Sequence, residues 1–270
     1  MDYKSITYEK TDGIATITKV NKDMGYGMTR GVLVEMLRAL ADAEEDDAVR
    51  VIVITSAEGI HQGAIAVSEV IADSTPMQVR EVVQIGHELG RRIETIEKPV
   101  IGVVKKEATG GGFETLQPCD FIIAAENATF CQPEVGFGTT AGWGGIQRIS
   151  RMVPWRQAQR ILMAGDVISG KESVELGITT QAVPLEEVDD VVEKLCNKLK
   201  SFPAQSLAYT KTDMHKAWEM NLTEALAFEV EALSVLLAEG LHRDSLPDLM
   251  EGKTPTFPLY KRKRSGKDWH

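Results

Sequence analysis

Residues 97–138 read EKPVIGVVKKEATGGGFETLQPCDFIIAAENATFCQPEVGFG, and this stretch decides the fold. It begins with an apolar run at 99–104, which is typical of a strand buried on both faces of a sheet. Three glycines at 110–112 lead into a short helix, and strand-like runs follow at 121–125 and 128–131. Strands and helices alternate here, which indicates an α/β fold.

The alternation extends toward the N-terminus. Residues 5–20 alternate polar and apolar side chains around Asp12-Gly13, a pair that favours the tight turn of a hairpin. Helical spacing begins after Thr29, the expected N-cap. A buried strand is expected at 49–55 and a long helix at 76–96.

Toward the C-terminus the pattern changes. From Ile146 onward only helical spacing is evident, with breaks near Gly165, Gly177, Pro203 and Gly240. The sequence therefore predicts one α/β core with a helical C-terminal appendage, rather than two independent domains.

Charge and hydropathy exclude several classes of protein. The chain has 270 residues, a formal net charge of −10 and a pI near 5.1, which argues against a nucleic-acid-binding protein. A local pocket for one small anionic ligand is still compatible with that charge. No apolar run reaches the ~18 residues of a membrane span, and the N-terminus lacks the apolar region of a signal peptide. We expect a cytoplasmic protein without a membrane partner.

Cysteine and histidine usage argues against a metal or disulfide framework. The three cysteines form no CxxC pair and fit a reduced compartment. The five histidines show no metal-binding spacing, so no metal site is predicted.

The glycines at 110–112 are the first candidate site. Glycine lets the backbone approach a ligand closely, and a helix that starts there presents unpaired N–H groups to an oxyanion or a phosphate. The spacing matches neither nucleotide-binding glycine motif. A turn that only packs a helix against a strand would have the same sequence.

Two carboxylates and two loops accompany the glycines. Glu114 opens the helix after them, and Glu134 follows the strand that ends at Cys131. Two carboxyl groups around one pocket can divide acid and base work when their environments separate their pKa values. The loops at 56–66 and 136–148 flank them, although each could also be an ordinary surface loop.

These residues resemble the crotonase superfamily, also called the enoyl-CoA hydratase/isomerase family, over most of the chain. Four segments carry the resemblance in the family's order: Gly63-Ala64, residues 97–138, residues 141–184 (AGWGGIQRISRMVPWRQAQRILMAGDVISGKESVELGITTQAVP) and residues 244–264 (DSLPDLMEGKTPTFPLYKRKR). The resemblance implies an α/β, crotonase-like core of repeated ββα units with a C-terminal helical trimerisation segment. We place the core at 1–200 and the helical oligomerisation segment, with its basic tail, at 201–270.

The resemblance also implies the roles of single residues. The backbone N–H groups of Ala64 and Gly111 would form an oxyanion hole for the thioester carbonyl, and Glu114 and Glu134 would activate a water. Further substrate-binding residues are expected at Gln62, Gly63, Ile65, Ala66, Gly110, Gly142 and Trp143. No cofactor is implied, because coenzyme A enters as part of the acyl-CoA substrate.

Three departures from the family's pattern concern substrate binding. Residues 105–108 (KKEA) replace an Asn-Gly pair, Ile65 replaces a frequent Asp, and residues 21–28 (NKDMGYGM) replace a stretch that helps hold the adenine of CoA in relatives. Trp143 stands where relatives commonly carry a small residue. It could reshape the acyl pocket in favour of an unusual cyclic or aromatic acyl group, or it could pack outward or at a subunit contact. Tyr26 and Phe137 are further candidate pocket walls.

The resulting functional hypothesis is an enoyl-CoA hydratase, a lyase that adds water to the α,β double bond. Δ3–Δ2 isomerisation of enoyl-CoA and ring-opening C–C hydrolysis of a cyclic keto-acyl-CoA are alternatives within the family. A catalytically silent binding protein is the alternative from another class. By resemblance we expect a homotrimer, or a hexamer built from two trimers.

Overall fold

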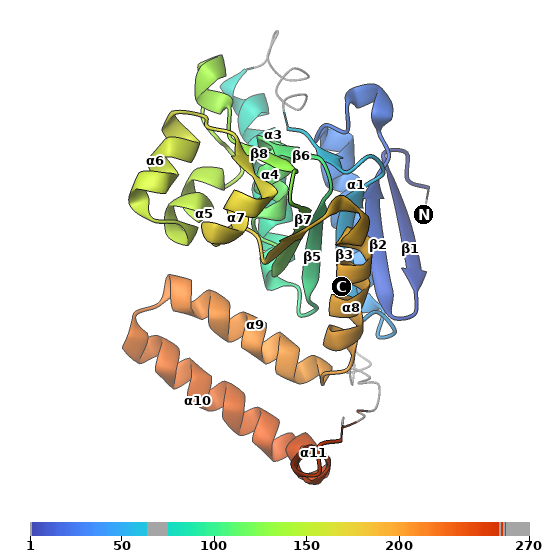
Figure 1. Ribbon diagram of the computed structural model, residues 1–270. Coiled ribbons are helices and arrows are strands. Elements are labelled where there is room, and N and C mark those ends of the chain that lie inside the picture. The colour runs from blue at the N-terminus through green and yellow to red at the C-terminus, as the bar shows by residue number, and fades with distance from the viewer. Residues whose placement is uncertain (1, 64–74, 254, 256, 258–270) are drawn as a thin grey trace.

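The structure is a computed structural model of the chain, and it describes residues 2–63, 75–253, 255 and 257. Two β-sheets and the helices around them form the core, and the helices at the end of the chain form a separate layer beneath it (Figure 1). This arrangement confirms the predicted α/β fold with a helical C-terminal region.

The larger sheet has six strands in the order β1-β2-β3-β5-β7-β10. These strands are Ile6–Thr11 (β1), Ile14–Lys19 (β2), Val51–Ser56 (β3), Val100–Val104 (β5), Phe121–Ala125 (β7) and Gln181–Val183 (β10). The β1–β2 pair is the predicted antiparallel hairpin, with positive φ angles of 49° at Asp12 and 76° at Gly13. The other neighbours pair in parallel, and β5 is buried along its whole length.

The smaller sheet has four strands in the order β4-β6-β8-β9. They are short: Ile60–His61 (β4), Glu107–Thr109 (β6), Thr129–Cys131 (β8) and Ile168–Ser169 (β9). The strands β4, β6 and β8 each follow a strand of the larger sheet directly in the chain, and a helix comes after each of them. The repeated ββα units are therefore present, and the turn from strand to helix recurs at one end of the small sheet.

Side chains at their first turns define where the long core helices begin. Thr29 accepts a hydrogen bond from the Val32 N–H and caps Arg30–Glu45 (α1), as the sequence predicts. Thr75 and Gln78 form a capping box at the start of Pro76–Thr95 (α3), with proline at the first position. The remaining core helices are Gly111–Leu116 (α4), Gly145–Met152 (α5), Trp155–Met163 (α6), Gly170–Glu175 (α7) and Val188–Lys200 (α8), and single 3₁₀ turns occupy Lys22–Met24, Glu134–Phe137 and Leu185–Glu187.

The expectation of helices alone after Ile146 is wrong at two places. The strand β9 pairs antiparallel with β8, and β10 pairs in parallel with β7 at the edge of the larger sheet. Two or three residues are too few to show an alternating pattern. Their partners lie far away in the chain, so local sequence does not reveal the pairing.

Three helices follow the core, at Ala204–Glu219 (α9), Leu222–Glu239 (α10) and Leu241–Met250 (α11). Helices α9 and α10 run side by side below the sheet (Figure 1). Lys211 of α9 fastens this layer to the core, because its ammonium group donates to Asp120 at 2.7 Å and to the carbonyl oxygen of Ile93 at 2.8 Å. Within the described residues, none of the helices combines the length and apolar character needed to cross a membrane.

Candidate active site

The three glycines at 110–112 lie where the end of strand β4 packs directly against the start of helix α4. A Cβ on Gly112 would stand 2.1 Å from the carbonyl oxygen of His61, and one on Gly63 would stand 2.0 Å from the Gly111 nitrogen. Gly110 has a φ of 52° and is the N-cap residue of α4. Side chains at these positions would force the backbones apart. The glycines therefore allow the strand end at 61–63 to lie directly on the start of α4.

This contact leaves a helix N-terminus at the surface of the site. The Gly111 N–H belongs to the first turn of α4, where no helical carbonyl can accept it. Gly63 packs against that nitrogen, and Gln62 pairs with Gly27 through an isolated bridge. Ala64, Ile65 and Ala66 lie outside the described residues, so their predicted roles stay predictions.

Glu114 projects from α4 into the protein and is 3% exposed. Its Oε1 atom accepts hydrogen bonds of 2.7 Å from the backbone N–H groups of Trp143 and Gly145. Burial raises the pKa of this carboxyl group, while the N–H groups of Gly145, Trp143 and Gly142 and the charge of Arg148 act in the opposite direction. The carboxyl group is held rigidly by the loop that precedes α5.

Glu134 begins the 3₁₀ turn that follows β8 and is half-buried. Burial raises its pKa to about 7, and the nearby charge of Glu114 adds to the shift. A Cβ on Gly110 would lie 3.0 Å from Glu134 Oε1, so this carboxyl group lies against the start of α4. Two carboxyl groups with raised pKa values thus lie near one helix N-terminus.

Gln132, which has no assigned role in the sequence analysis, connects these two groups. It is 1% exposed, and a Cβ on Gly145 would stand 2.8 Å from an atom of its terminal amide and 2.9 Å from Glu114 Oε1. When its amide nitrogen faces Glu134, Gln132 donates to both carboxyl oxygens of Glu134 at 3.0 Å. The amide therefore lies beside one carboxyl group and binds the other.

Trp143 is buried, which excludes the outward packing left open by the sequence. Its indole ring lies between two helices, because a Cβ on Gly86 of α3 or on Gly111 of α4 would stand 2.4 Å from ring atoms. Its carbonyl oxygen accepts a hydrogen bond of 3.0 Å from Arg148, and Arg148 pairs with Glu94 at 2.7 Å. The ring thus contacts the residue whose N–H faces the site.

The sequence and the fold both resemble those of known proteins. The sequence profile described as enoyl-CoA hydratase/isomerase matches residues 9–258. The chain belongs to the enoyl-CoA hydratase/isomerase family. It is 30% identical to the crotonyl-CoA hydratase of Syntrophomonas wolfei, over 95% of this chain and 99% of that protein. It is 29% identical to the short-chain-enoyl-CoA hydratase of Clostridium acetobutylicum, over 93% of this chain and 96% of the other.

Solved structures in the enoyl-CoA hydratase/isomerase family share the fold. An enoyl-CoA hydratase subunit from Geobacillus kaustophilus superposes with a TM-score of 0.88 at 26% identity, covering 96% of this chain and all of the other. An enoyl-CoA hydratase from a Polaromonas species gives 0.89 at 23% identity, covering 94% and 99%. The crotonase-superfamily resemblance stated from the sequence is confirmed.

Residues 21–28, which depart from the family's pattern, are held by a second residue that sequence reasoning missed. Lys19, at the end of β2, is 1% exposed, and its ammonium group donates to the carbonyl oxygen of Tyr26 at 2.9 Å. Tyr26 is buried and has a φ of 58°, a left-handed conformation that is strained for a tyrosine. Burial lowers the pKa of Lys19 to about 7. The buried hydrogen bond from Lys19 therefore stabilises the backbone turn at Tyr26.

The remaining candidates from the sequence are Phe137, Lys105, Lys106 and Gly142. Phe137 is 71% exposed, so its ring is largely in solvent and forms no buried pocket wall. Lys105 pairs with Asp189 at 2.7 Å, and Lys106 pairs with Glu58 at 3.1 Å. Gly142 precedes Trp143 in the loop that holds Glu114, and its neighbourhood is open.

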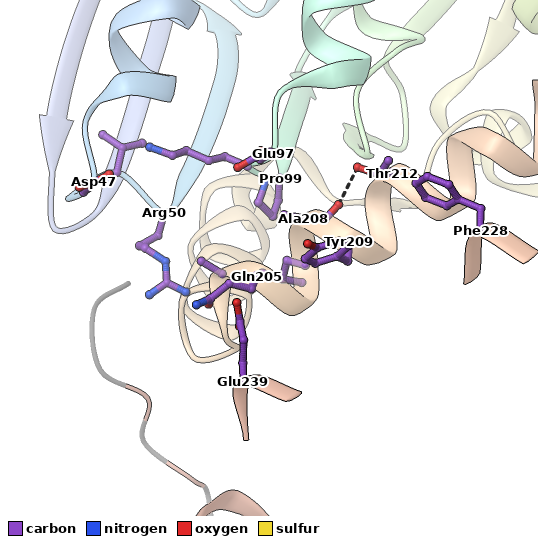
Figure 2. A pocket seen from close by; sticks show the side chains of 14 residues that line it. Asp47, Arg50, Glu97, Pro99, Gln205, Ala208, Tyr209, Thr212, Phe228 and Glu239 are labelled. Atoms are coloured by element: carbon purple, nitrogen blue, oxygen red, sulfur yellow. Dashed lines mark hydrogen bonds between the residues drawn. The ribbon is translucent and has the colours of Figure 1, made fainter. Parts of the chain in front are cut away.

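Two cavities in the described part of the chain are lined by residues of the C-terminal helices and the adjoining core, and not by the two glutamates. The smaller, of about 270 Å³, lies between Arg50, Pro99 and helix α9 (Figure 2). The larger, of about 430 Å³, lies around Lys211, Met214 and Trp218. Neither includes Glu114 or Glu134, so the candidate active site rests on the carboxyl pair and the helix N-terminus.

Proposed function

We propose that this protein adds water across the α,β double bond of an enoyl-CoA thioester. The observation that carries the proposal is the pair of carboxyl groups, Glu114 and Glu134, beside the first-turn N–H of Gly111. The hydratase names of the curated relatives point to the same reaction. The proposed hydration needs only acid, base and N–H groups, so it calls for no metal or redox cofactor.

The thioester carbonyl oxygen would accept hydrogen bonds from the N–H groups of Gly111 and Ala64. Negative charge grows on this oxygen as the enolate forms, so donors aimed at it stabilise the transition state. Loss of one such donor typically costs about 2.7–4 kcal/mol. The position of Gly63 against Gly111 supports this assignment, because Ala64 is the next residue along the chain.

The two carboxyl groups would share one proton in the reactive state. Ionised Glu114 accepts a proton from the water while the water oxygen bonds to the β-carbon. Protonated Glu134 gives its proton to the α-carbon, so the substrate gains one water in total. The proton left on Glu114 then passes to Glu134, so the next turnover begins with Glu114 ionised and Glu134 protonated.

This scheme determines the pH dependence. Activity requires one proton on the pair, so kcat/KM should fall as pH rises above about 7, where Glu134 loses its proton. Hydration releases no net proton, so the kcat/KM profiles for hydration and dehydration should have the same shape. A kcat/KM for hydration that stays constant as pH rises above about 7 would contradict a proton shared by the pair.

One assay separates hydration from the other family reactions. The protein is mixed in turn with crotonyl-CoA, a 3-enoyl-CoA and a cyclic 3-keto-acyl-CoA, and products are identified by mass. A gain of one water on crotonyl-CoA, with loss of enoyl absorbance, is the expected result. A product of unchanged mass from the 3-enoyl-CoA indicates isomerisation, and ring opening of the keto-acyl-CoA indicates C–C hydrolysis. Binding without turnover of any of them would indicate a silent binding protein.

We further propose that Trp143 limits the acyl group. The indole ring packs on Gly111, so it lies next to the N–H that would hold the thioester carbonyl. Trp143→Ala should raise kcat/KM for long or cyclic enoyl-CoA substrates relative to crotonyl-CoA, because it opens space beside the acyl chain. Trp155→Ala, an exposed tryptophan on α6, is the matched control. An unchanged preference across acyl-CoA substrates would end this idea.

A further inference from the structure

Two buried glutamine side chains form a chain of hydrogen bonds that starts at Glu134: Gln132 binds Glu134, and Gln117 binds Gln132. Gln132 and Gln117 are 1% and 2% exposed. With the Gln132 amide nitrogen turned to Glu134, its amide oxygen accepts a hydrogen bond of 2.9 Å from the Gln117 amide nitrogen. Gln117 lies three residues after Glu114, at the C-cap of α4. Both amides are therefore fixed between elements that carry the carboxyl pair.

One atom of this chain of hydrogen bonds has no partner. Gln117 Oε1 is buried, and the described residues offer it no hydrogen-bond donor. A buried polar atom without a partner costs about 1–3 kcal/mol. A second arrangement of the same side chains would give this oxygen a donor, and the Gln117 amide nitrogen would then take the unpaired position.

Rotation of both amides supplies that donor. If each terminal amide turns by half a rotation, the Gln132 nitrogen faces Gln117 Oε1, and the Gln132 oxygen faces Glu134. Amide nitrogen and oxygen are nearly equal in size, so the exchange leaves the packing unchanged. The first arrangement offers Glu134 a donor, which suits a carboxylate. The second offers an acceptor, which suits a protonated carboxyl group.

We propose that Gln117 and Gln132 form an amide relay that reverses direction each time Glu134 gains or loses its proton. When Glu134 is ionised, hydrogen bonds run from Gln117 to Gln132 to the carboxylate. When Glu134 is protonated, its O–H donates to Gln132, and Gln132 donates to Gln117 Oε1. No proton passes along the relay, because only the amide orientations change. Gln117 is a positioning residue, since it acts on Glu134 through Gln132.

The inference rests on the proposed function, in which Glu134 exchanges a proton with the substrate. A general acid that also acts as the base in the reverse reaction needs a partner for each of its two states. A fixed donor would favour the carboxylate alone, since hydrogen bonds to a charged group are roughly twice as strong as neutral ones. A reversible amide pair serves both states and keeps Glu134 ready to change its protonation.

The direct test observes both glutamines in the wild-type protein. The protein is labelled with ¹⁵N in glutamine side chains and ¹³C in glutamate carboxyl groups, and NMR signals are followed from pH 5 to 9. The relay requires the Gln117 and Gln132 amide signals to shift with the same midpoint as the Glu134 carboxyl carbon. In Glu134→Gln, neither amide should titrate. A Gln117 signal that stays constant while Gln132 titrates would overturn the relay.

Substitution supplies the second test. Gln117→Met keeps the length of the side chain and removes its donor and acceptor. We expect kcat with crotonyl-CoA to fall about tenfold, with KM changed by less than about twofold, because Gln117 does not reach the substrate. The midpoint of the Glu134 titration should rise, because Gln132 is no longer held with its nitrogen toward the carboxylate.

Gln157→Met is the matched control for this substitution. Gln157 lies on α6 outside the relay, and its Oε1 atom is also buried without a partner. It should leave kcat and the Glu134 titration as in the wild type. Equal effects of both substitutions would make the role of Gln117 merely structural and overturn the proposal. The NMR titration needs no turnover, so it decides the relay even if crotonyl-CoA is not a substrate.

Discussion

The core and the C-terminal helices both carry regular apolar patterns, yet they bury them very differently. In the core, Phe113 and Phe130 are fully buried, and their rings pack 5.2 Å apart between α4 and β8. On the C-terminal helices, Leu222 is 74% exposed and Met250 is 86% exposed. Each core pattern faces a sheet of the same chain, whereas much of the pattern on α9 to α11 faces none.

This difference bears on what one chain can complete by itself. A large exposed apolar surface marks an interaction site. The prediction that these helices associate into trimers is consistent with that surface, and it stays a prediction. The candidate site, by contrast, is formed by core residues alone wherever the structure describes it. Substitutions in the two regions should therefore change different properties.

The largest effect is expected from the carboxyl pair. Glu114→Gln and Glu134→Gln should each lower kcat by about 10³-fold, or about 4 kcal/mol, because one acid or base group is lost. The amide oxygen of Gln at 114 can still accept from Trp143 and Gly145, so folding should be preserved. Enzyme kinetics with crotonyl-CoA measure the loss, and light scattering should show an unchanged association state. Full activity in both variants would refute the mechanism.

The attachment of α9 to the core is the next most sensitive point. Lys211→Met leaves the Asp120 carboxylate buried without its cation, so the free energy of unfolding should fall by about 3–4 kcal/mol. Urea denaturation followed by circular dichroism measures it. Lys216→Met, which breaks an exposed pair with Glu219, should change it by less than about 1 kcal/mol. Similar values for both variants would show that the buried pair does not anchor the helix.

The exposed face of α10 should control association without affecting the fold. Val230 and Leu233 are 62% and 54% exposed. Replacing both with Glu should weaken self-association by about 100-fold, or about 2.7 kcal/mol, because charge is placed on an apolar contact. Sedimentation should detect a trimer or larger assembly in the wild type and a smaller species in the variant. A wild-type monomer at micromolar concentration would contradict the prediction.

The smallest effect concerns Lys19 and appears as a pH dependence of stability. Its pKa is about 7 in the folded protein and near 10.5 when exposed, so the unfolded chain holds the extra proton between these values. The contribution of Lys19 to stability should therefore rise with pH across this window and be lowest below pH 7. Lys19→Met should remove this contribution to the slope and raise stability at pH 6 by about 2 kcal/mol.

Thermal unfolding between pH 6 and 10 tests the role of Lys19. Lys171→Met, at an exposed position of α7, is the control and should keep the wild-type slope. A slope that survives in Lys19→Met would show that Lys19 is not its source.

Most core elements could be predicted because their signals are local. The Asp12-Gly13 turn, the Thr29 cap and the buried β5 run each depend on neighbouring residues. The second sheet could not be predicted in full, because its two- and three-residue strands pair across long separations, such as Ile60 with Glu107. Strands this short carry no detectable period.

The candidate site divides in the same way. The sequence predicts the two glutamates and the three glycines as site residues, because they stand beside strand ends and match the family's pattern. The partners of these residues were not, because Gln117 meets Gln132 and Arg148 meets Glu94 only after folding. A buried lysine such as Lys19 gives no local signal either, since charged residues at strand ends are usually solvated.

The indole of Trp143 also limits how this site can change by mutation. A side chain larger than glycine at 86 or 111 collides with the ring, while a smaller residue at 143 leaves a void of indole size between α3 and α4. Each of these single substitutions should lower stability, so a change of side-chain size at 86 or 111 needs a compensating change at 143. A library that varies 86 and 143 together would therefore yield more well-packed variants than one that varies 143 alone.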